Sequence, residues 1–172
     1  MPSTGEPTTD RDAPEFRQIQ DDERFRDWLQ LQQDAVEGEF AGTDVPELHD
    51  HLWTREGLRI AEREMLRRFS DFDEMVSEEH FDVGVRFVYL IGETFRRALE
   101  GIWVLLPPNP PDRPDPVCVI DSPMWTAFHD PAHMSGLAFD RRTGQEISWI
   151  FDRTVKRHRK WVEAGRLPRG ER

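Results

Sequence analysis

The spacing of apolar residues along the chain predicts four helices. In the first segment, apolar side chains recur every three or four residues from Phe25 to Val36, and Gly38 is expected to end the helix. A second helix is predicted over about 55–69, with the side chain of Thr54 as its N-cap. The last helix is predicted over about 146–164, with one apolar face and one basic face.

The third predicted helix, over about 82–100, is the most apolar of the four. Its charged residues and Tyr89 lie on one narrow stripe of a helical wheel, and the remaining positions are apolar or small. A helix with this pattern packs on several sides, so we expect it at the centre of the domain. Gly101 is expected to end it in a left-handed conformation.

Two short β-type runs, 102–106 and 117–120, flank a proline-rich loop and are expected to pair with each other. A weaker third strand is predicted at 136–139. Helices and strands together predict an α+β fold: a helix-rich single domain with a central buried helix and a small, two- to three-stranded antiparallel sheet. We expect this domain to cover residues 14–164, between a disordered tail at 1–13 and a basic tail at 165–172.

Composition places the chain among folded proteins. Six Trp and eleven Phe in 172 residues argue against global disorder, because large apolar side chains need a core. A single cysteine, Cys118, cannot form an intrachain disulfide. The sequence contains neither an apolar stretch of about 18 residues nor a signal-peptide pattern, so we expect a cytoplasmic location and no membrane contact. Of the 23 basic residues only Lys156 and Lys160 are lysines, a bias that indicates a bacterial source.

Charge is distributed unevenly along the chain, whose net charge is −11. Residues 1–50 contain 14 acids and 4 bases, whereas residues 151–172 contain 3 acids and 8 bases. An acidic front half repels nucleic acid and attracts a basic protein partner. We expect the bases of 153–172 to be surface charge that pairs with this acidic half. A nucleic-acid interface is the weaker alternative, because only Trp149 offers an exposed aromatic ring there.

Histidines and carboxylates form two clusters that could bind a metal. The stronger is His129, Asp130 and His133, with Asp121 as a further oxygen ligand; a divalent ion there would support hydrolysis. The weaker is 49–51 with Glu47, for which a solvated linker is the simpler interpretation. We expect no cofactor unless the first cluster binds a divalent metal.

The polar stripe of the central helix allows two interpretations. Tyr89, Glu93 and Arg97 could line a cleft in which the acid and the phenol act as an acid/base pair. Alternatively, the stripe consists of ion pairs four residues apart, namely Asp82–Arg86, Glu93–Arg97 and Arg96–Glu100. The second interpretation explains more residues with fewer assumptions.

The segment GETFRRALEGIWV, residues 92–104, resembles small bacterial domains of unknown function, some of which occur in toxin-immunity neighbourhoods. In those domains a buried helix bearing Gly-Glu is followed by a glycine and then by a strand that begins with Trp. The resemblance implies an α+β fold and assigns no catalytic residue. The chain also lacks the common nucleophile-elbow, dinucleotide and phosphate-loop motifs.

These observations predict a non-enzymatic, acidic protein-binding domain, of which an immunity or inhibitor protein that neutralises a basic partner is the most concrete version. The alternatives are a metal-dependent hydrolase or metal-binding domain at the His129 and His133 cluster, and a structural accessory subunit. The predicted docking residues are Asp21, Asp22, Glu23, Asp34, Glu37, Glu39, Asp44, Glu47 and Asp50.

Overall fold

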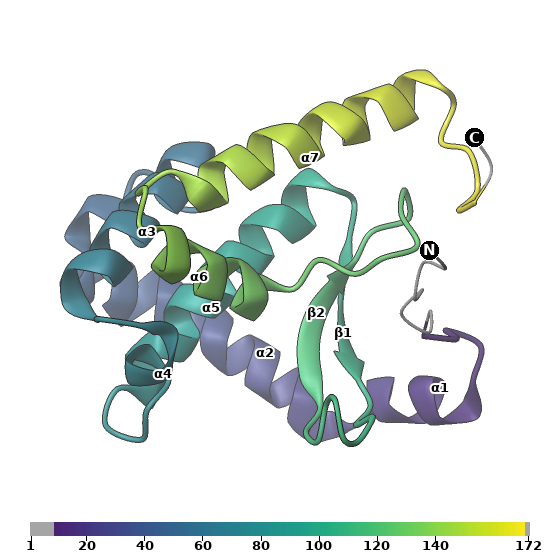
Figure 1. Ribbon diagram of the computed structural model, residues 1–172, viewed down its shortest axis with the longest axis horizontal. Helices are drawn as coiled ribbons and strands as arrows, with labels where there is room; N and C mark the ends of the chain where they lie inside the picture. Colours follow the sequence, from purple (N-terminus) through teal and green to yellow (C-terminus); the bar gives the residue numbers. More distant parts are fainter. Residues whose placement is uncertain (1–8, 171–172) are drawn as a thin grey trace.

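The computed structural model describes residues 9–170 and confirms the α+β class (Figure 1). The order along the chain is α1 (Pro14–Gln20), α2 (Glu23–Ala35), the π-helix η1 (Val36–Asp44), the 3-10 turn η2 (Pro46–Leu48), α3 (Arg55–Arg68), α4 (Phe72–Met75), α5 (Phe81–Ala98), β1 (Ile102–Leu106), β2 (Val117–Asp121), α6 (Pro131–Arg141) and α7 (Glu146–Glu163). Within 9–170, no helix is long and apolar enough to cross a membrane.

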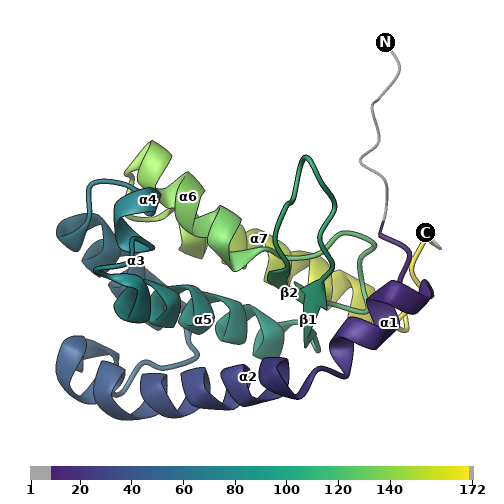
Figure 2. The same ribbon diagram turned by 90° about the horizontal axis from the view of Figure 1, so that it is seen from below.

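Helix α5 occupies the middle of the molecule, as its apolar circumference predicts. Figure 2 shows α2 on one side of it and α6 with α7 on the other, so the helices form three layers. Close approach of neighbours requires glycine at two positions of α5. A Cβ atom on Gly84 would lie 2.1 Å from the Met75 carbonyl oxygen, and one on Gly92 would lie 2.2 Å from the indole of Trp103.

The sheet is a single antiparallel hairpin in which Ile102 of β1 pairs with Asp121 of β2, and Leu106 with Val117. One face of the hairpin packs against α1 through Phe16, in a small second core. Gln20 of α1 extends this contact, because its side-chain amide donates to the Leu105 carbonyl and accepts from the Leu105 N–H. The hairpin therefore joins α1 to the central helix layer.

Three expectations about local structure were wrong. Residues 136–139 form no third strand; they belong to α6, because Asp130 caps the helix and Pro131 occupies its first turn. Gly38 does not end the first helical segment, which widens into η1 and keeps Val36 and Phe40 buried. The left-handed residue after α5 is Glu100, with φ of 55°, instead of Gly101.

Both ends of the described chain meet at Asp121. Arg11, within the segment predicted to be disordered, forms a bidentate ion pair with this carboxylate, with both N–O distances 3.0 Å. Arg169, within the predicted basic tail, donates to the same group at 2.7 Å. The two chain ends consequently lie at one end of the molecule (Figure 1). Of the predicted tails, residues 1–8 and 171–172 lie outside the described residues.

Helix α7 begins on a buried carboxylate of α3. Glu62 is fully buried and accepts hydrogen bonds from the backbone N–H groups of Glu146 and Ile147, each at 2.9 Å. These are orphan donors at a helix start, where the helix dipole also favours negative charge. Burial raises the pKa of Glu62, although the two hydrogen bonds act against that shift.

We expect Glu62→Ala to lower the free energy of unfolding by about 2–3 kcal/mol, because it leaves two buried N–H groups without acceptors. Urea denaturation followed by circular dichroism measures this change. Glu56→Ala is the matched control on the same helix: within residues 9–170 its carboxylate pairs with exposed Arg59, so it should cost less than about 1 kcal/mol. Equal effects of the two substitutions would contradict the capping role.

Candidate functional site

Most of the predicted acidic docking residues are paired within the chain. Arg86 lies 3.3 Å from Asp44 and 3.5 Å from Glu39, and Arg63 pairs with Glu47. Asp22 caps α2 and binds the Arg24 side chain, while Asp21 binds Arg26. Asp50 contacts His49. Glu23, Asp34 and Glu37 are exposed and have no basic partner in the described part of the chain.

The predicted cleft at Tyr89, Glu93 and Arg97 is filled by tryptophan side chains. The Trp103 ring stacks on Tyr89 at 5.3 Å, and Trp28 and Trp53 meet its edge. Tyr89 is 3% exposed and donates to the Gln33 side chain at 2.8 Å; burial raises the pKa of its phenol. The interior of this stripe is therefore packed instead of open.

Glu93 is the centre of this packed cluster. Burial acts to raise the pKa of Glu93, but hydrogen bonds from Arg96, Arg97 and Trp103 outweigh it and lower the pKa. The predicted Glu93–Arg97 ion pair is confirmed. The predicted Asp82–Arg86 and Arg96–Glu100 pairs were wrong, because Arg86 binds η1 and Glu100 binds Arg166 and His158.

The residues of the predicted metal cluster have separate structural roles and do not converge on one site. Asp130 caps α6 by accepting from the His133 N–H, and His133 is exposed on that helix. His129 precedes the cap and is buried, so the two imidazoles do not share a helix face. Asp121 is already bound to arginines. Between residues 9 and 170, no three His, Cys, Asp or Glu side chains are placed to hold a metal ion.

A groove forms instead between α7 and the loop that follows β2. The loop, residues 122–130, is closed at its base by two backbone hydrogen bonds of 2.9 Å between Ile120 and His129. The hydroxyl of Ser122 fixes the start of the loop by donating to the Leu99 carbonyl at 3.0 Å. These bonds position Trp125 opposite α7, across a hollow of about 260 Å³.

Helix α7 contributes tryptophan and arginine at intervals of one turn. Trp149, Arg153 and Arg157 are spaced four residues apart and line the same side of the helix. The guanidinium of Arg153 lies over the Trp149 ring at 4.5 Å, and that of Arg157 lies over Trp125 at 4.6 Å. Stacking on the aromatic faces orders both cations without neutralising them.

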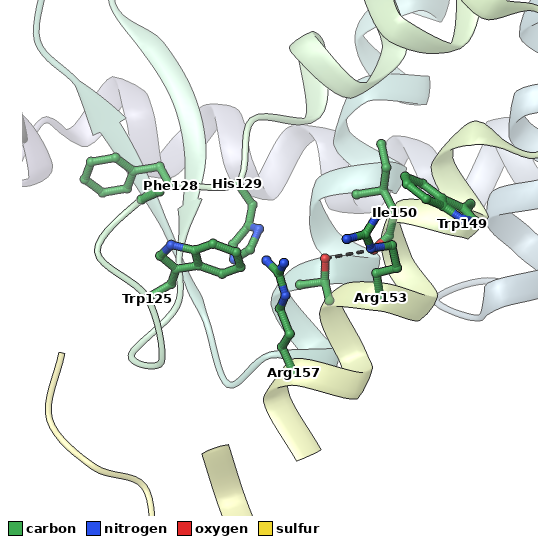
Figure 3. A pocket seen from close by; sticks show the side chains of 9 residues that line it. Trp125, Phe128, His129, Trp149, Ile150, Arg153 and Arg157 are labelled. Atoms are coloured by element: carbon green, nitrogen blue, oxygen red, sulfur yellow. Dashed lines mark hydrogen bonds between the residues drawn. The ribbon is translucent and has the colours of Figure 1, made fainter. Parts of the chain in front are cut away.

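His129 completes the groove from the loop side (Figure 3). Its side chain is 9% exposed, and Nε2 has no hydrogen-bond partner among residues 9–170. Burial lowers the pKa of His129 to about 4, although nearby Asp121 acts in the opposite direction. The imidazole is therefore neutral at pH 7 and leaves a polar nitrogen just beneath the groove surface.

Among residues 9–170, no base of α7 pairs with the acidic front half, contrary to expectation. Two acids of α7 pair with other helices instead: Asp152 with Arg55 of α3 and Glu146 with Arg141 of α6. Arg153, Lys156, Arg157, Arg159 and Lys160 have no acidic partner in the described chain. Trp125 was not predicted as a site residue, because only the loop brings it to α7. The local signal for it is a tryptophan inside an otherwise irregular segment.

Comparison of the chain with protein-family models, curated proteins and solved structures gives no match.

We expect His129 to make stability depend on pH in mild acid. Its pKa is depressed in the folded state, so the unfolded chain takes up a proton first and stability falls as pH decreases from 6.5 to about 4. At about 1.4 kcal/mol per pKa unit, the full loss is about 3 kcal/mol. Urea denaturation across this range should show a shallower slope for His129→Phe and an unchanged slope for His133→Phe. A wild-type slope in His129→Phe would contradict this origin.

Proposed function

We propose that this protein acts by stoichiometric binding, and that its groove between α7 and the 122–130 loop recognises an anionic group. The observation that carries the proposal is the pair Arg153 and Arg157. Both are held in place by tryptophans, both lack an acidic partner among the described residues, and both line one hollow. Guanidinium groups in this state favour phosphate, sulfate or carboxylate ligands.

The charge of the rest of the molecule limits the size of this anion. With a net charge of −11, the protein repels a long polyanion, whereas a compact anion contacts only the basic face of α7. Among the described bases, five lie on that helix without partners. The proposed ligand is therefore a compact anion and not a nucleic acid.

Calorimetric titration with inorganic pyrophosphate tests this proposal. We expect Arg153→Gln and Arg157→Gln each to weaken binding about tenfold, because each removes one charge-assisted contact. Arg159→Gln is the control, since Arg159 is exposed on α7 and does not line the groove. Absence of pyrophosphate binding to the wild-type protein, or equal losses in all three variants, would contradict the proposal.

A second candidate function uses the opposite charge, on α2. Leu31 is 62% exposed, and the acids Asp27 and Asp34 lie one turn away on either side of it. An exposed apolar residue with an acidic rim is suited to a basic protein partner, as an immunity or inhibitor protein requires. An accessory subunit of an enzyme would use the same kind of surface.

A charge-reversal pull-down separates this candidate from non-specific attraction. We expect the combined substitutions Asp27→Lys and Asp34→Lys to abolish recovery of a basic partner from the native lysate, because they reverse the charges that attract it. The combined Glu78→Lys and Glu79→Lys variant makes the same change in net charge at another exposed site and should retain it. Equal recovery by both variants would eliminate α2 as the docking surface.

A further inference from the structure

A second and larger hollow adjoins the groove. It measures about 660 Å³ and lies between Trp125 of the loop, Trp161 of α7 and the segment that follows α7. Trp125 and Arg157 line both hollows, so the two are neighbours that share one wall. This volume lies within the range of about 300–1,000 Å³ that small-molecule sites occupy.

Residues 165–170, here called the C-terminal strap, form the outer wall of this hollow. Arg166 forms a bidentate ion pair with Glu100, and Arg169 binds Asp121 and the Ser122 carbonyl. The Trp161 indole N–H donates to the Leu167 carbonyl at 2.8 Å. These contacts hold the strap at both ends, so the hollow exists before a ligand arrives.

The lining of the hollow combines apolar walls with positive charge. Met124, Trp161, Leu167 and Pro168 supply apolar and aromatic surface. Arg157 and Lys160 are its charged lining residues, and none of its described lining residues is acidic. Such a lining favours a ligand with a flat apolar body and a negative group at one end.

We infer that groove and hollow together form one site for a small aryl anion. Its ring occupies the hollow against Trp125 and Trp161, and its carboxylate, sulfonate or phosphate lies against Arg157. This inference rests on the proposed function, since it names the class of ligand that the anion-binding groove takes. It adds the requirement that the ligand also carries an aromatic body.

Calorimetric titration with 2-naphthalenesulfonate tests the inference, with 2-naphthalenemethanol and inorganic sulfate as matched probes. Each matched probe keeps one half of the ligand. We expect the sulfonate to bind at least about tenfold more tightly than either, because only it uses both the aromatic hollow and the cation. Sulfate that binds as tightly as 2-naphthalenesulfonate would overturn the inference.

Variants of the hollow locate the binding. Ala164 lines the hollow at the end of α7, and Ala164→Trp should weaken naphthalenesulfonate binding about tenfold while leaving pyrophosphate binding unchanged. Gln30→Trp, at an exposed position of α2, is the control for an added indole. Lys160 is exposed, so Lys160→Gln is a milder substitution. It should weaken sulfonate binding severalfold even if Ala164→Trp fails to fold.

The outcomes distinguish this inference from the proposed function. One result is pyrophosphate binding that depends on Arg153, together with an aryl sulfonate that binds no more tightly than its matched probes. This result would support the anion-binding groove and overturn the inference of an aryl ligand. An affinity for the aryl sulfonate that is unchanged in both Ala164→Trp and Lys160→Gln would also overturn the inference. Tight sulfonate binding that is lost in Arg157→Gln and reduced in the hollow variants supports it.

Discussion

A buried carboxylate at the end of β2 organises the end of the molecule at which the two chain ends and the 122–130 loop meet. Asp121 is 7% exposed, and an unpaired charge at such a depth would be strongly unfavourable. It is bound by Arg11 from before α1 and by Arg169 from after α7. The same residue directly precedes the loop that presents Trp125 to α7. Two chain ends and one loop therefore share a single anchor.

Helix α7 is the other half of this arrangement, and its position depends on contacts made elsewhere. Glu62 fixes its start through two backbone N–H groups, and Ile147 packs into the main core. With one face of α7 buried, the bases that lack an acidic partner among residues 9–170 face outward, and Arg157 among them lies over Trp125 of the loop. The groove is thus a consequence of how α7 is anchored, and its two arginines are ordered by the rings beneath them.

Much of the fold followed from sequence patterns, because those patterns act over short distances. Helix α5, the pairing of 102–106 with 117–120 and the Thr54 cap of α3 all depend on neighbouring residues. The site did not follow, because it depends on pairs far apart in the chain. Arg11 and Asp121 are 110 positions apart, and the whole of α6 lies between Trp125 and Arg157 in the chain. The strand predicted at 136–139 is part of α6, because the cap at Asp130 begins a helix there.

In the proposed arrangement, the loop at 122–130 and α7 form a preformed site for a small anion with an aromatic body. Intermolecular nuclear Overhauser effects between 2-naphthalenesulfonate and the wild-type protein test it most directly. We expect contacts from the naphthalene protons to the indole protons of Trp125 and Trp161. Contacts to Trp28 or to Leu31 on α2, with none to Trp125, would contradict it.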